Sequence, residues 1–159
     1  MKTALTIRNA EVVLPVRTER TDVSVINGRI CAIGNEIPDV GEVIDADGLF
    51  LLPGIIDPQV HFREPGADHK EDLHSGSCAA AAGGVTSFLD MPNNTPPVIT
   101  RQRMQGKKQL AAEKSVVNYG FFMGATPDNL EELNAVENVC GIKIFMGSST
   151  GDLLGDDPD

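Results

Sequence analysis

A regular alternation of strand and helix signals after Pro53 limits the folds open to this chain more than any other feature. Four apolar runs that favour strands, IIDPQVHF, VTSFLDM, VVNYGFFMG and GIKIFMG, recur at intervals of about 25 to 30 residues, the length of a βα unit. Segments with helix signals separate them. The helices are predicted at residues 70–82, at residues 100–114 and from residue 127 onward. The pattern therefore predicts a parallel sheet in an α/β fold.

Local signals define the ends of these helices. Gly83 and Gly84 are expected to stop the first helix, because glycine is favoured just past a helix C-terminus. Thr100 is expected to cap the second helix. Thr126 is expected to cap the third, with Pro127 at its first helical position. Each cap is a separate prediction of where a helix begins or ends.

Two architectures contain repeated βα units, and the sequence separates them. A doubly wound sheet would need a glycine-rich phosphate turn after its first strand, and the sequence has none there. A (β/α)8 barrel places functional side chains at the C-terminal ends of successive strands, where His61, Asn93 and the residues after Lys143 fall. A barrel needs roughly 250 residues. We therefore expect residues 54–159 to form about the first half of a (β/α)8 barrel.

Residues 1–53 carry strand signals only, and we expect a small β-sheet domain of sandwich type there. Short alternating runs such as TALTIRNA, DVSVI and RICAIG are bounded by turn residues. Asn27-Gly28 joins the last two runs and is the strongest two-residue hairpin signal. The sequence thus divides into a sheet domain at 1–53 and a half barrel at 54–159.

Charge and composition exclude several classes of partner. The formal net charge is −10 and Lys/Arg clusters are absent from the sequence, whereas nucleic acids and anionic membranes are bound through basic side chains. The N-terminus has neither a long apolar run nor a cleavage pattern, so we expect a cytoplasmic protein. Cys31, Cys78 and Cys140 form no C-x-x-C motif, and we expect reduced, buried thiols.

The stretch GIIDPQVHFREPG, residues 54–66, alternates between apolar and polar residues. That period is typical of a β-strand, so one face is expected to carry Asp57, Gln59, His61 and Arg63. The other face is too apolar to be wet. We therefore expect the strand to deliver these polar side chains into a pocket. Taken alone, His61 would ordinarily be interpreted as a hydrogen-bonded core histidine.

This stretch, together with HKED, AAAGGVTSFLDMPNNTPP and GIKIFMGSSTG, resembles the N-terminal part of a dihydroorotase of the amidohydrolase superfamily. The resemblance extends over nearly the whole chain. In that family a strand carries H-x-H, two histidines on one face that bind a metal, usually zinc. His61 matches the second histidine, and Gln59 stands in the place of the first. A glutamine oxygen is neutral and harder than an imidazole nitrogen, so Gln59 is expected to hold zinc poorly, or only through a water.

The resemblance implies one or two zinc ions, the second bridged by Lys143 as a carbamate. Lys143 lies on a strand expected to be buried on both faces, and burial favours the neutral amine that can capture carbon dioxide. Alternatively, Lys143 extends to the pocket mouth or pairs with Asp90. His69 and His74 are interpreted as surface or helix-packing residues.

The resemblance also assigns Arg63 and Asn93 to binding a substrate carboxylate. A planar guanidinium can grip a carboxylate with two hydrogen bonds. Arg63 could instead form a salt bridge with Glu64 or Asp57, and Asn93 could simply make the turn after Met-Pro. Allantoinases and hydantoinases that resemble this region lack the arginine. The pair therefore favours an acidic cyclic amide as the small-molecule substrate.

The expected reaction interconverts dihydroorotate and N-carbamoyl-aspartate in pyrimidine synthesis, with zinc polarising the ring carbonyl and activating water. The resemblance implies two further metal histidines and a catalytic Asp beyond residue 159, so we expect this chain alone to be inactive. Two alternatives remain: a hydantoinase or allantoinase, and a non-catalytic paralogue that serves as an assembly partner. Its protein partner, a second copy of the chain or a pyrimidine-pathway enzyme, stays open.

Overall fold

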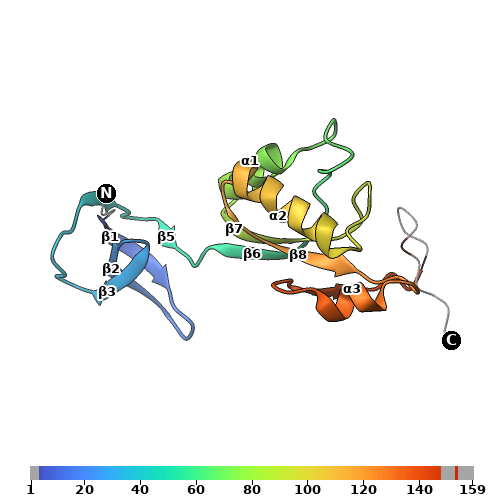
Figure 1. Cartoon of the computed structure of the whole chain (residues 1–159). Coiled ribbons are helices and arrows are strands. Elements are labelled where there is room, and N and C mark those ends of the chain that lie inside the picture. The colour runs from blue at the N-terminus through green and yellow to red at the C-terminus, as the bar shows by residue number, and fades with distance from the viewer. Residues whose placement is uncertain (1–3, 148–152, 154–159) are drawn as a thin grey trace. The chain divides into compact units, whose positions relative to one another are not determined.

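The structure, a computed structural model, describes residues 4–147 and Leu153. Contacts between Cα atoms divide the chain into two compact units, Met1–Pro53 and Gly54–Asp159 (Figure 1). The division falls where strand-only signals give way to the alternation of strands and helices. Among the described residues, no helix is both long enough and apolar enough to span a membrane.

The first unit is a five-stranded sheet. Its strands are β1 (Ala4–Val13), β2 (Thr18–Ile26), β3 (Arg29–Gly34), β4 (Glu42–Asp45) and β5 (Phe50–Leu51). The order is β3-β2-β1-β4, and β5 also pairs with β1. The β2–β3 hairpin turns at Asn27 and Gly28, which have φ values of 52° and 73°, so both adopt the left-handed conformation that a tight hairpin requires. The hairpin predicted from Asn27-Gly28 is therefore present.

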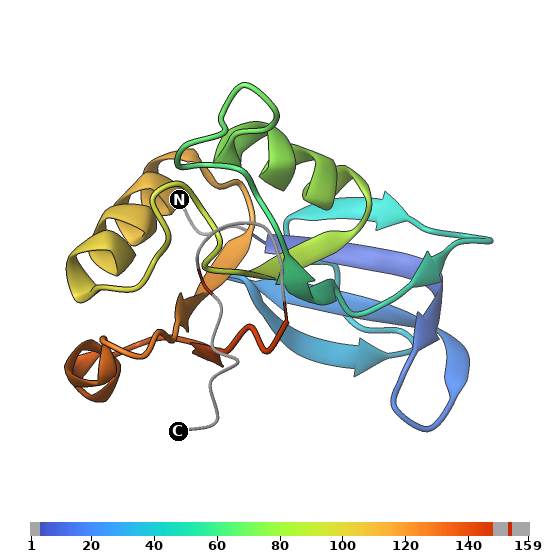
Figure 2. The same ribbon diagram turned by 90° about the vertical axis from the view of Figure 1, so that its right-hand side faces the viewer.

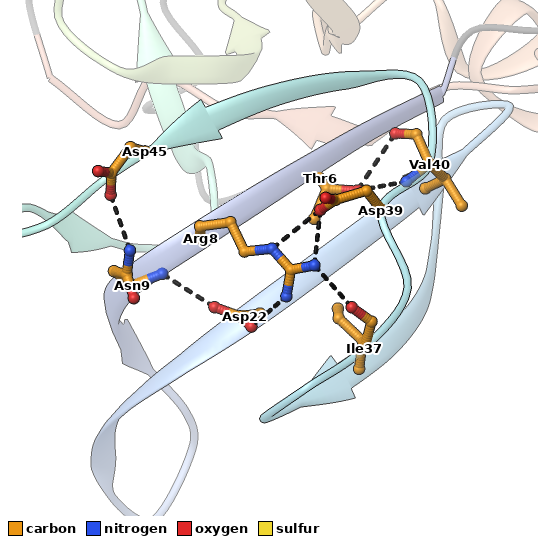
Figure 3. A network of polar contacts seen from close by, with 8 residues as sticks. All are labelled: Thr6, Arg8, Asn9, Asp22, Ile37, Asp39, Val40 and Asp45. Carbon is orange, nitrogen blue, oxygen red and sulfur yellow. Dashed lines mark hydrogen bonds and ion pairs between the residues drawn. The ribbon is translucent and has the colours of Figure 1, made fainter.

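A polar network ties the strands of this unit together (Figure 3). The Arg8 guanidinium contacts Asp22 at 2.5 Å, donates to Asp39 at 2.6 and 2.9 Å, and donates to the Ile37 carbonyl at 2.7 Å. Asn9 lies within β1 with a φ of 61°, and its backbone N–H donates to Asp22 at 2.9 Å. The β1–β2 register shifts between Ile7 and Ala10. The network thus stabilises a bulge and joins β1 to β2 and to the segment before β4.

The second unit is a four-stranded parallel sheet in the order β6-β7-β8-β9. Its strands are β6 (Ile55–Val60), β7 (Val85–Asp90), β8 (Asn118–Gly124) and β9 (Gly141–Lys143), and its helices are α1 (Leu73–Ala82), α2 (Arg101–Lys114) and α3 (Leu130–Ala135). Strands that are consecutive in sequence are neighbours in the sheet, as in a barrel. Helices α1 and α2 lie on the same side of the sheet (Figure 2). The predicted α/β half barrel is confirmed.

Two helix starts agree with their local signals and one does not. Asp72 caps α1 by accepting from the Ser75 N–H at 2.7 Å, and Thr100 caps α2 as predicted. The prediction of a third helix from Pro127, capped by Thr126, is wrong, because α3 begins only at Leu130. The Asn129 side chain accepts from the Thr126 N–H at 2.8 Å. It also donates at 2.9 Å to the carbonyls of Ile99 and Gly124. These bonds hold residues 126–129 in a separate turn.

The alternation predicted along β6 breaks at Pro58. The β6–β7 register shifts between Asp57 and Val60, and β6 ends at Val60. Proline has no N–H to donate to the ladder, and the N–H of Gln59 turns to the Asp57 side chain at 3.1 Å. The prediction that Asp57, Gln59, His61 and Arg63 share one face of a single strand is therefore wrong. His61 and Arg63 lie beyond the strand end.

The core of the second unit is aromatic and dense. Phe88 is fully buried and meets Phe62 edge-on, with 4.6 Å between ring centroids. The buried members of this core are Leu73, Phe88, Val98, Met104, Ala111, Phe121 and Met123. The core of the first unit is smaller and consists of Ala10, Val12, Val23 and Ala46. The two units therefore differ in how much apolar volume each one buries.

Two predictions about burial are wrong. Strand β9 is not buried on both faces in the described chain, since Ile142 and Ile144 on either side of Lys143 are 41% and 56% exposed. Strand β9 is paired only with β8 among the described strands, and this leaves its flank open. The three cysteines are free, as expected, but they are exposed rather than buried.

Candidate functional site

The loops that follow β6 and β7 bring two of the predicted site residues into contact. His61 Nδ1 lies 2.8 Å from Asn93 Oδ1. An amide oxygen only accepts hydrogen bonds, so this contact places the ring proton on Nδ1 and leaves Nε2 as the basic nitrogen. A histidine whose Nδ1–H is held in this way has the orientation that metal-binding histidines commonly show. The carboxyl ends of adjacent parallel strands therefore meet at one polar position.

Arg63 lines a pocket beside this contact. The pocket has a volume of about 190 Å³ and also contains the side chains of Asn93 and Lys70. Arg63 is exposed, and none of the ion pairs found among residues 4–147 involves it. The proposed salt bridge with Glu64 is absent because Glu64 pairs with Lys114. The pocket is thus cationic, with a guanidinium available for an anion.

A fully buried ion pair lies next to the site and was not predicted. Lys107 on α2 meets Asp90 at the end of β7 at 2.7 Å, and both side chains are 0% exposed. Asp90 Oδ2 contacts the ammonium as an ion pair without a well-directed hydrogen bond. Burial raises the pKa of Asp90 and lowers the pKa of Lys107, and the attraction between the two charges opposes both shifts. The alternative pairing of Lys143 with Asp90 is therefore wrong.

The signal for this ion pair was present in the sequence but ambiguous. Met104, Lys107 and Ala111 follow one another at helical spacing and are the buried residues of α2. A lysine in a helix usually lies on the solvent-exposed face. Only the position of α2 against β7 shows that Lys107 points inward.

The other proposed metal ligands do not complete a metal site within the described chain. Gln59 is exposed, and Lys143 is half-buried with its Nζ 5.3 Å from the Phe145 ring centroid. Among residues 4–147 and Leu153, no group of three or more His, Cys, Asp or Glu side chains is placed to hold a metal ion. The described residues therefore fit one well-oriented imidazole ligand, His61, and not a full ligand set. Residues 148–151 of the GSSTG segment lie outside the described residues.

The remaining histidines lie away from this position. His69 is exposed, and His74 on α1 is exposed with its Nδ1 3.1 Å from the Lys114 carbonyl. His74 Nε2 faces Cys78 Sγ at 3.7 Å. Both histidines therefore behave as surface or helix-packing residues.

Successive βα units with polar side chains gathered at the strand ends define the class of (β/α) barrel proteins, whose sites form at that end of the sheet. Comparison with known families narrows this class. The model of the amidohydrolase family matches residues 50–150, and the chain belongs to this family.

The similar proteins have more than one activity. An allantoinase from Deinococcus radiodurans is 41% identical over 153 residues, which are 94% of this chain and 34% of that protein. A dihydroorotase from Methanosarcina acetivorans is 39% identical, over 92% of this chain and 32% of that protein. The chain spans about a third of the length of these curated relatives. Sequence similarity therefore does not separate an allantoinase from a dihydroorotase.

Solved structures agree on the fold. An L-hydantoinase (dihydropyrimidinase) from Arthrobacter aurescens has a TM-score of 0.86 and 28% identity, over 95% of this chain and 35% of that chain. A dihydropyrimidinase from Brevibacillus agri has a TM-score of 0.80 and 31% identity, over 98% of this chain and 35% of that chain. The half barrel and its separate sheet unit therefore match the amidohydrolase fold.

Proposed function

We propose that the whole protein hydrolyses a cyclic amide and that its substrate is an acidic ring of the dihydroorotate type. The observation that carries this proposal is the pocket beside the His61–Asn93 contact, which contains Arg63 and Lys70. A substrate carboxylate has a chemical reason to enter this pocket, because two cations line it and Arg63 has no ion-pair partner among residues 4–147.

Arg63 and Asn93 are the proposed carboxylate contacts. The guanidinium provides two parallel N–H donors, and an asparagine amide provides N–H donors of the same kind. Asn93 Oδ1 already accepts from His61, so one residue would link the metal ligand and the substrate pocket.

His61 is the residue that would hold a metal through Nε2, with Gln59 and Lys143 as the proposed further ligands. A bound zinc ion would supply Lewis acidity and a more acidic water. Within this chain, Asn93 keeps the His61 ring oriented and Arg63 orients the acid. Two further metal histidines, a catalytic Asp, the carbamate on Lys143, a cytoplasmic location and a protein partner stay predictions.

An allantoinase is the second candidate. The 41% identity with the allantoinase of Deinococcus radiodurans favours it. Allantoin has no carboxylate, so Arg63 and Lys70 would have no ionic partner in that substrate. The cationic pocket is therefore what separates the two candidates.

The test compares Arg63→Lys and Arg63→Met with the parent, in the protein as its gene encodes it. For dihydroorotate, Arg63→Met should lower kcat/KM by about one to two orders of magnitude, because a charge-assisted hydrogen bond contributes about 1.5–3 kcal/mol. The kcat/KM of Arg63→Lys should lie between those of the parent and of Arg63→Met, since lysine keeps the charge but cannot form two parallel hydrogen bonds. Metal content, measured by elemental analysis, should not change.

Dihydrouracil and allantoin are the control substrates, because neither ring carries a carboxylate. Their turnover should be little affected by either substitution. Equal losses for acidic and neutral rings, or loss of metal, would mean that Arg63 supports the site as a whole. Efficient turnover of allantoin with none of dihydroorotate would assign the protein to the second candidate.

A further inference from the structure

The ammonium group of Lys107 contacts three residues of one short segment, residues 90–94. Its Nζ lies 2.7 Å from Asp90 Oδ2, 3.0 Å from the Met91 carbonyl and 2.6 Å from Asn94 Oδ1. The Met91 carbonyl and Asn94 Oδ1 accept hydrogen bonds from the ammonium, and Asp90 Oδ2 contacts it as an ion pair. Lys107 itself is 1% exposed, so water does not compete for these contacts. The side chain is a fixed link between α2 and residues 90–94.

Two of these three partners hold the segment that carries His61 and Arg63. Asp90 Oδ1 accepts from the Phe62 N–H at 3.0 Å. Asn94 Nδ2 donates to the Phe62 carbonyl at 3.3 Å and to the Glu64 carbonyl at 2.9 Å. The peptide groups on both sides of Phe62 are therefore fixed by side chains that Lys107 fixes in turn.

The site residues are immediate neighbours of these anchored positions. His61 and Arg63 flank Phe62, and Asn93 precedes Asn94. The 2.8 Å contact between His61 and Asn93 thus joins the two segments that the Lys107 contacts hold together. Lys107 is not among the described residues that line the pocket of Arg63 and Asn93, so any effect on the site passes through other residues.

Stability alone does not account for such a pair. Replacing a buried ion pair by apolar side chains of similar volume is often neutral or stabilising, because burial of two charges is costly. A fully buried pair that also holds a carbonyl and an amide at a site has a second use, namely to fix geometry.

We infer that Lys107 is a positioning residue, which holds the loop of Asn93 against the segment of His61 and Arg63 in the geometry that binds substrate and metal. The inference rests on the proposed function for its kinetic consequence, and on the contacts alone for its structural one. Displacing functional groups by about 1 Å can lower an enzymatic rate by roughly a hundredfold, so a loosened link should be measurable.

The test uses the double variant Lys107→Met/Asp90→Asn in the protein as its gene encodes it. The variant removes both charges together, so no unpaired charge is left in the core, and Asn at position 90 can still accept from Phe62. A thermal midpoint close to the parent is expected. The kcat/KM for dihydroorotate should fall by roughly ten- to a hundredfold. The ring nitrogen signals of His61 in ¹⁵N NMR spectra should shift or broaden.

Asn94→Leu is a second variant. It keeps the Lys107–Asp90 ion pair and removes the hydrogen bonds that join Asn94 to Lys107 and to the Phe62 and Glu64 carbonyls. It should change the His61 signals in the same direction. The matched control is Lys108→Met, since Lys108 is the next lysine on α2 and donates to the Glu137 carbonyl at the surface. This control should leave both the signals and the turnover at parent values.

The outcomes separate the two claims. A folded double variant with parent-like His61 signals and turnover would overturn the positioning role. If the parent hydrolyses no cyclic amide, the proposed function fails, whereas a change in the His61 signals still supports the role of Lys107.

Discussion

The two units differ in how far their charged networks are exposed to solvent. In the first unit, the Arg8 side chain is 23% exposed and its partner Asp39 is 57% exposed. In the second unit, Lys107 and Asp90 are 0% exposed. Both networks join separate elements of one unit, Arg8 by bonding β1 to β2 and to the segment before β4, and Lys107 by bonding α2 to the end of β7. Water can therefore reach the Arg8–Asp39 contact, whereas the Lys107–Asp90 contact is closed to water.

The first network is partly exposed to solvent, whereas the second is buried and holds core elements in place. An exposed ion pair contributes little, because each charge is well solvated without its partner. A buried pair is costly to form and costlier to break, because a single remaining charge has no solvent. The candidate site lies next to the buried network, so the geometry of the site depends on the network that tolerates change least.

The largest expected effect comes from breaking the buried pair from one side. Asp90→Ala leaves the Lys107 ammonium buried and removes the acceptor of the Phe62 N–H. The free energy of unfolding should fall by about 5 kcal/mol, mostly from the uncompensated charge. Arg8→Ala, the matched change in the first unit, should lower the thermal midpoint by only about a few degrees. Urea denaturation and thermal unfolding of both variants and the parent measure the contrast.

If Asp90→Ala is no less stable than Arg8→Ala, the pair is solvated in solution and the contrast between the units disappears. A large loss of stability in Arg8→Ala would also contradict the contrast between the units. It would mean that the bulge at Asn9 depends on the guanidinium and not only on Asp22.

A second, somewhat smaller loss of stability is expected from substitutions in the two apolar cores. Phe88→Ala removes a fully buried ring that packs against Phe62 and Phe121, and should cost about 3–5 kcal/mol. Val23→Ala in the first unit removes two carbons from a core of small side chains, and should cost about 2 kcal/mol. The measurement is again the free energy of unfolding in urea. Similar losses at both positions would mean that the first unit is packed as tightly as the second.

Local signals predicted the elements of the fold well, and missed the places where distant groups intervene. The spacing of apolar runs gave the parallel strands, and Thr100 gave the start of α2. The start of α3 was missed because Asn129 bonds to the Ile99 carbonyl, 30 residues earlier in the chain. The break in β6 at Pro58 could have been predicted, since proline cannot donate to a ladder.

The sequence singled out the residues of the candidate site, but it did not predict how they are arranged. Motifs singled out His61, Arg63 and Asn93, and the structure brings His61 and Asn93 within 2.8 Å. That Asn93 holds the histidine ring follows only from the way the loops meet. Lys107 was missed altogether, because no local rule distinguishes a buried helical lysine from a solvated one.

The smallest expected effect is on stability at low pH. Ionisation of Asp22 in the first unit and of Asp90 in the second should change the free energy of unfolding in opposite directions as the pH falls. The Asn9 N–H, followed by the Arg8 guanidinium, holds the pKa of Asp22 below its ordinary value of 3.8. The folded state therefore binds this proton less readily than the unfolded state does. The stability that Asp22 contributes is fully present above the unfolded pKa, and is lost as the pH falls through the folded pKa. Burial raises the pKa of Asp90, so Asp90 takes up its proton more readily when folded and does not contribute to acid unfolding.

Asp22→Asn tests this sign directly, because its amide oxygen can still accept from the Asn9 N–H while the titrating carboxyl is gone. The variant should be less stable than the parent at about pH 6, and the gap should narrow as the pH falls toward about 3. Unfolding in urea at a series of pH values measures the two curves. Parallel curves would show that ionisation of Asp22 is not coupled to folding. Asp90→Asn, measured in the same series, should not flatten the loss of stability in acid, because the pKa of Asp90 is shifted by burial in the direction opposite to that of Asp22.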